Sequence, residues 1–134
     1  MAKTINKLPA YIGWGTSLST VVDAGSDLVV GLVMPDVWTA ARVSVQLSID
    51  GVEFRDLFYF ERGESTSAKE VVFNVTPGVA VAIDPNTMLM ARYIKLRSGT
   101  RDEPVNQEET CAFTVITVDT AAAQSKSADD GVTA

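Results

Sequence analysis

The sequence predicts an all-β protein, a two-sheet antiparallel sandwich of jelly-roll-like type. Polar and apolar residues alternate without a break over 42–49, which is the period of a strand with one buried face. Turn signals recur at intervals of roughly 8–12 residues, as they do in β-sandwiches. No long stretch shows the apolar period of an amphipathic helix. Together these observations predict one domain of about eight strands.

The expected strands follow one another with short turns between them. A weak strand at 16–22 precedes 28–34, which is apolar on both faces. Such a strand is either covered on both sides by its own domain or lies at an interface. Pro35 ends it, and Trp38 is expected to plug one end of the sandwich. The remaining expected strands are 42–49, 53–60, 70–75, 79–83, 92–97 and 110–118.

Two local signals predict turns. Asp50-Gly51 predicts a tight hairpin between 42–49 and 53–60, because both central residues of that turn need positive φ. In this register Ile49 faces the core together with Val43, Val45 and Leu47. Asp84 is expected to cap one helical turn that starts at Pro85.

The two ends of the chain differ from the strands in between. Residues 1–16 are expected to form an extended N-terminal arm, residues 17–118 the sandwich domain, and residues 119–134 a flexible tail or a second arm. The arm mixes large apolar groups with Pro and Gly, so it needs a surface to lie on. That surface is either its own domain or a neighbouring subunit.

Composition argues against catalysis and against several classes of ligand. Histidine is absent, which removes the commonest general base and metal ligand, and Cys111 is the single cysteine. We therefore expect no enzyme activity, no cofactor and no metal, and we expect Cys111 to be a small buried hydrophobe. The net charge of −6 argues against a nucleic-acid partner.

No segment reaches the roughly 20 apolar residues of a membrane span, and Lys3 and Lys7 are not followed by the apolar stretch of a signal peptide. The sequence therefore predicts no membrane partner, with synthesis and assembly in the cytoplasm.

One stripe concentrates positive charge near the end of the domain. It consists of Arg92, Lys95, Arg97 and Arg101, and acidic residues follow it directly. In 92–97, Ile94 and Leu96 are expected to point inward while Lys95 and Arg97 point outward. The stripe either pairs with acids on the same surface or complements a patch on a neighbouring copy.

Several segments resemble, in the same order, small virion proteins of tailed bacteriophages. These segments are 30–57, Ala82-Ile83-Asp84-Pro85, 92–100 and Pro104-Val105-Asn106-Gln107. The resemblance implies a capsid decoration, or cement, protein on a jelly-roll-like scaffold, bound to the exterior of the capsid in the virion. Its implied partners are the major capsid protein and itself, as a homo-dimer or homo-trimer. The alternative is a head-fibre or tail module that binds a host receptor or glycan.

Under either interpretation the protein would act through its surface. The residues expected at a protein interface belong to the arm, to the two-sided strand and to the basic stripe: Leu8, Tyr11, Ile12, Trp14, Val29, Val33, Arg92, Lys95, Arg97 and Arg101.

Overall fold

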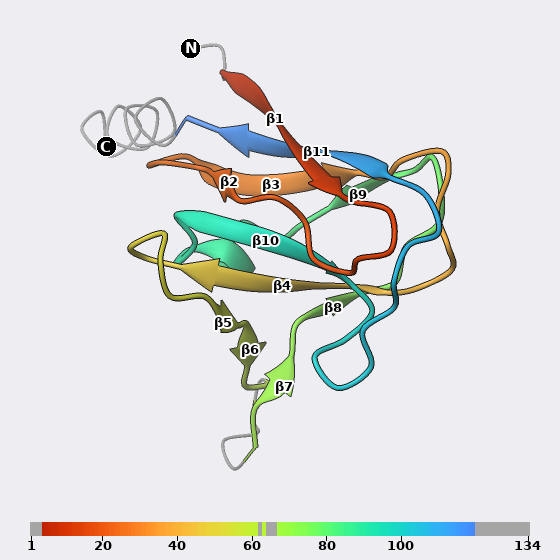
Figure 1. The fold of residues 1–134 in the computed structure, drawn as a ribbon. Coiled ribbons are helices and arrows are strands. Elements are labelled where there is room, and N and C mark those ends of the chain that lie inside the picture. The colour runs from red at the N-terminus through yellow and green to blue at the C-terminus, as the bar shows by residue number, and fades with distance from the viewer. Residues whose placement is uncertain (1–3, 62, 64–66, 120–134) are drawn as a thin grey trace, which may run out of the picture.

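The computed structural model describes residues 4–61, 63 and 67–119, and it confirms the all-β prediction. Two antiparallel sheets face each other, with one short 3₁₀ helix, η1 (Figure 1). Of the tail expected at 119–134, all but Asp119 lies outside the described residues. The strands are β1 (Ile5–Ile12), β2 (Val22–Asp23), β3 (Leu28–Val33), β4 (Val43–Ser48), β5 (Arg55–Asp56), β6 (Phe58–Tyr59), β7 (Lys69–Glu70), β8 (Val72–Phe73), β9 (Ala80–Ala82), β10 (Tyr93–Ser98) and β11 (Cys111–Val118), and η1 spans Pro85–Met88.

The first sheet has the strand order β1-β11-β3-β9, and the second has the order β2-β10-β4-β5, with β8 also pairing with β4. Strands β6 and β7 form a separate two-stranded ribbon that extends away from the sandwich (Figure 1). The core lies between the sheets and takes residues from both inner faces. Trp38 packs edge-on against Phe113, with 5.3 Å between ring centroids.

The expected N-terminal arm is, over most of its described length, a strand of the domain. Strand β1 pairs with β11 from Ile5↔Val118 to Ile12↔Cys111. Ala10 and Ile12 are fully buried, because the alternation places them on the inner face of the sheet. Of the two surfaces considered for this segment, its own domain is therefore the one it uses, and the boundary at residue 16 is corrected.

The segment that follows β1 closes one edge of the sandwich. The N–H of Thr20 donates to the carbonyl of Tyr11 at 2.8 Å, and the N–H of Ser19 donates to the carbonyl of Leu96 at 2.8 Å. The same few residues therefore pair with β1 of the first sheet and with β10 of the second. Of the weak strand expected at 16–22, only β2 at its end is a regular strand.

The turn at Asp50-Gly51 is wider than the sequence predicted. Strands β4 and β5 pair as expected, but the register joins Leu47 to Arg55, so the loop is longer than two residues. Gly51 has φ of 80°, whereas no non-glycine residue in the described parts of the chain has positive φ. The carboxylate of Asp50 instead accepts from the backbone N–H groups that follow it, as Asp does in many loops. Ile49 is consequently 78% exposed and does not face the core.

Strand β3 is an interior strand of the first sheet, between β11 and β9, and its inward side packs into the core. Its alternation is broken by a bulge, because Ile116 pairs with Gly31 while Thr117 pairs with Val29. The extra residue, Val30, lets Val29 and Leu32 both face the core.

The helical turn at η1 is as predicted. The carboxylate of Asp84 accepts from the N–H of Asn86 at 3.0 Å, and Pro85 occupies the first position.

Candidate functional site

The outward positions of the first sheet form a face of mostly small and apolar side chains, which we call the outer face. Cross-strand partners share a side of a sheet, so the pairing registers define its members. Lys7 is the one charged residue among them. The outer face consists of Ile5, Lys7, Pro9, Tyr11, Leu28, Gly31, Val33, Ala80, Ala82, Ala112, Thr114, Ile116 and Val118.

The register arranges the outer face in rows across four strands. One row joins Lys7, Ile116, Gly31 and Ala82, and the next joins Pro9, Thr114, Val33 and Ala80. Tyr11 is 47% exposed and Val33 is 37% exposed. The larger side chains of the face therefore remain in contact with solvent, although their neighbours along each strand pack into the core.

This exposure bears on the two-sided strand predicted at 28–34. Strand β3 buries Val29 and Leu32 in the core, but the opposite side of the same strand has no covering layer in the described chain. Contiguous apolar patches of this kind on soluble proteins mark interaction surfaces. The outer face is accordingly the candidate functional site.

Only part of the expected interface set lies on the outer face. Tyr11 and Val33 belong to it, whereas Ile12 and Val29 are 0% and 1% exposed in the core. Leu8 is half-buried against the same core. The expectation that Leu8, Ile12 and Val29 contact a partner is therefore corrected, because strand alternation and the bulge turn them inward.

Trp14 lies outside the regular strands and is 74% exposed. Its backbone N–H donates to the hydroxyl of Thr110 at 3.2 Å, which fixes the loop that carries it.

The basic stripe does not form an open positive patch. Arg92 lies 3.7 Å from a carboxylate oxygen of Asp23 and stacks over the Tyr93 ring at 5.0 Å. The ammonium of Lys95 lies 4.4 Å from the centre of the Phe54 ring. The Arg92 contact agrees with pairing to acids on the chain's own surface, which was one of the two interpretations of the stripe, whereas Lys95 contacts an aromatic ring.

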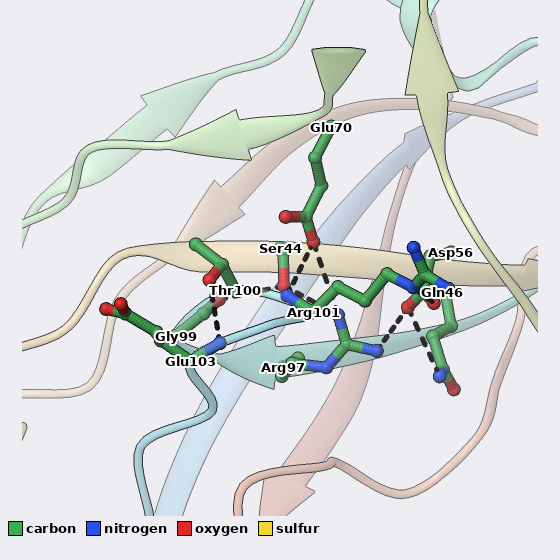
Figure 2. Close-up of polar contacts among 9 residues, drawn as sticks. All are labelled: Ser44, Gln46, Asp56, Glu70, Arg97, Gly99, Thr100, Arg101 and Glu103. Atoms are coloured by element: carbon green, nitrogen blue, oxygen red, sulfur yellow. Dashed lines mark hydrogen bonds and ion pairs between the residues drawn. The ribbon is translucent and has the colours of Figure 1, made fainter. Parts of the chain in front are cut away.

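Arg97 departs most from the expectation, because its side chain is only 7% exposed. Its guanidinium contacts the carboxylate of Asp56, and its Nη1 lies 3.3 Å from Glu70 Oε2 and 3.2 Å from Ser44 Oγ (Figure 2). Arg101 completes the network, with its Nε 3.3 Å from Asp56 Oδ2 and its backbone N–H donating to Glu70 at 2.9 Å. Arg97 is therefore a buried structural charge and not a surface contact.

The Arg97 network explains how the β6–β7 ribbon is held. Asp56 belongs to β5 and Glu70 to β7, and both carboxylates meet the same guanidinium on β10. Burying such a group is favourable only with well-placed partners, so the network fixes the base of the ribbon against the second sheet. Sequence reasoning missed both acids because they are distant from Arg97 along the chain.

A hollow of about 480 Å³ lies between the ribbon and η1, and we call it the ribbon pocket. Its walls come from the strands β6, β7 and β8 on one side and from the η1 segment on the other. The lining residues are Leu57, Phe58, Tyr59, Glu70, Val71, Val72, Phe73, Asn86, Thr87 and Met90. No residue expected at a protein interface is among them.

Other chemistry in the described residues is limited. Cys111 is buried as predicted, and burial raises the pKa of its thiol. Among residues 4–61, 63 and 67–119, no group of three or more acidic, cysteine or histidine side chains is placed to hold a metal ion. The same part of the chain contains no helix with the length and apolar character needed to cross a bilayer.

Comparison of the chain with models of protein families, with curated proteins and with solved structures gave no match. The outer face, the Arg97 network and the ribbon pocket are therefore the observations from which function is inferred.

Proposed function

We propose that the protein is a capsid decoration, or cement, protein of a tailed bacteriophage. It binds the exterior of the shell and stabilises contacts between neighbouring capsomers. Its partners are the major capsid protein and further copies of itself, as a homo-dimer or homo-trimer. The observation that carries the proposal is the outer face, which is apolar, nearly free of charge and uncovered in the described chain.

The strand order supports a jelly-roll-like scaffold for this role. Strands β1-β11-β3-β9 face β2-β10-β4-β8, and the chain crosses between the two sheets at each step from β1 to β4 and again from β8 to β11. Two facing sheets built in this alternating way are typical of jelly rolls, which occur in viral capsid domains. In this interpretation the segment β5–β7 is an insertion between the fourth and fifth of eight strands.

The size of the outer face suggests how it acts. Four strands about 4.8 Å apart and about 20 Å long give a footprint of about 400 Å². At about 25 cal/mol per Å², covering it contributes about 10 kcal/mol before the losses of association, which are about 4–15 kcal/mol. One contact is then weak, and stable binding needs several contacts on one oligomer. A decoration protein that links neighbouring capsomers meets that condition.

The test is co-sedimentation of the purified protein with empty shells of the phage that encodes it. The proposal expects binding that saturates at about one copy per coat subunit or per symmetry contact. Val33→Lys places a charge in the centre of the outer face and should abolish sedimentation with the shells. Val52→Lys makes the same change on a loop residue that is 81% exposed, and it should bind as the wild type does.

Failure of the wild-type protein to sediment with shells would refute the decoration role. If Val33→Lys still bound, the contact would move off the outer face while the role itself stood. Circular dichroism of both variants establishes that each remains folded.

A further inference from the structure

The ribbon pocket combines an apolar floor with a polar mouth. Leu57 and Val71 are 4% and 5% exposed and are joined where the N–H of Val71 donates to the carbonyl of Leu57 at 2.9 Å. Tyr59 and Phe73 lie two residues further along the same two chain segments and also line the pocket. Tyr59 is 44% exposed and presents part of its ring to solvent.

Across from this wall the η1 segment supplies polar groups. Asn86 and Thr87 line the pocket together with Met90, and Asn86 is exposed. An amide, an aliphatic hydroxyl and the phenol of Tyr59 each donate and accept hydrogen bonds. A purely apolar ligand would remove water from these groups without replacing their hydrogen bonds, which is unfavourable. A ligand rich in hydroxyl groups would replace them.

The pocket presents no free charge to such a ligand. Glu70 borders it, but its Oε2 is engaged by Nη1 of Arg97 at 3.3 Å and by the backbone N–H of Arg101 at 2.9 Å (Figure 2). The remaining lining residues are all neutral. The chemistry therefore suits an uncharged ligand, not a phosphate or a carboxylate.

The wall that carries Tyr59 is also held in place before any ligand arrives. Asp56 precedes Leu57 and Glu70 precedes Val71, and both acids are anchored on Arg97. A binding wall that is fixed in advance loses less conformational entropy when the ligand binds.

We propose that the ribbon pocket binds a neutral saccharide of one or two rings. The apolar C–H face of a sugar ring packs against the Tyr59 ring, and its hydroxyl groups bond to Asn86 and Thr87. The volume of about 480 Å³ lies within the range of ordinary ligand sites, about 300–1,000 Å³. The proposal is independent of the decoration role, since it uses a different surface.

The test is titration of the full chain, labelled with ¹⁵N, with glucose, galactose, N-acetylglucosamine and lactose. At least one of the four should shift amide signals of 57–59, 71–73 and 86–90, with a dissociation constant of about 0.1–10 mM. Tyr59→Ala and Asn86→Ala should each weaken that binding at least tenfold. Tyr11→Ala is the matched control, because Tyr11 is 47% exposed and lies on the outer face, and it should leave the binding unchanged.

Three results would overturn the saccharide site. The first would be that none of the four sugars shifts the named amides at 50 mM. The second would be that Tyr59→Ala binds the sugar as tightly as Tyr11→Ala does. The third would be that N-acetyl-leucine amide shifts the same amides while the sugars do not. The last result would mean that the pocket takes an apolar peptide side chain. Shell binding measured with the same Tyr59→Ala protein should remain at the wild-type level.

Discussion

Replacing Arg97 with methionine tests the assignment of this residue as a buried structural charge. The change keeps an apolar stem but removes the guanidinium, and so deprives Asp56 and Glu70 of the cation that they share. Their side chains are only 20% and 15% exposed. Leaving a buried charge without its ion-pair partner usually lowers the free energy of unfolding by about 3–5 kcal/mol. A contact of Arg101 remains on each acid, so we expect about 2–4 kcal/mol.

The assay is equilibrium unfolding in urea, with the free energy of unfolding extrapolated to water. Arg101→Met is the matched control, because the Arg101 side chain is 59% exposed and its ion pair should contribute at most about 1 kcal/mol. The triple variant Arg97→Met, Asp56→Asn, Glu70→Gln removes the unpaired carboxylates as well and should recover part of the lost free energy of unfolding. An Arg97→Met protein within about 1 kcal/mol of the wild type, or no less stable than Arg101→Met, would refute the reasoning.

Three further predictions concern single positions. Gly99→Ala should lower the free energy of unfolding by about 3 kcal/mol or more, because φ is +92° and a Cβ would lie 2.4 Å from the carbonyl oxygen of Glu103. Gly25→Ala, with φ of +59° and open space around it, should lower it by only about 1–2 kcal/mol, and equal losses in urea unfolding would contradict the structure. The Cys111 thiol, whose pKa is raised by burial, should resist Ellman's reagent in the native protein and react fully in urea; rapid native reaction would show that it is accessible. Hydrogen bonds from the backbone N–H groups of Val52 and Glu53 lower the pKa of Asp50 below 3.8. Its ionised carboxylate therefore stabilises the fold above pH 3.8, and this stabilisation is lost as the pH falls through the lowered pKa. Asp50→Asn should therefore be less stable than the wild type at pH 7, with a difference that shrinks below pH 3.8, and a pH-independent difference would contradict the role of the charge.

Much of the fold could be predicted because its signals are local. The two-residue period identified β4 and β10, including the inward Ile94 and Leu96, and the apolar run at 28–34 identified the central strand β3. Asp84 and Pro85 identified η1 for the same reason. Each of these features depends on residues that are neighbours in the chain.

The features that were missed depend on distant partners. Strand β1 looked like an arm because its segment mixes large apolar groups with Pro and Gly, and because its partner, β11, lies near the other end of the domain. The bulge at Val30 changes which side of β3 faces the core, and no residue type in this segment predicts a bulge. Arg97 looked like a surface charge because its acids are on β5 and β7.

The candidate site was predicted only in part for a related reason. Tyr11 and Val33 were expected at an interface and do lie on the outer face. The outer-face positions on β9 and β11 include Ala80, Ala82 and Ala112, which show no pattern in the sequence. They become a surface only when the sheet aligns them.

The position of β11 also constrains when this protein can fold during its synthesis. The last described strand to leave the ribosome lies in the middle of the first sheet, between β1 and β3. Until it emerges, β1 lacks the strand that pairs with it from Ile5 to Ile12, and β3 exposes the edge that β11 will occupy. Folding that depends on such non-local pairing is slow, and unpaired strand edges in a nascent chain favour association with other chains. A ribosome-bound chain that ends before residue 111 should therefore be protease-sensitive, and the native sheet should form only after synthesis has passed residue 118.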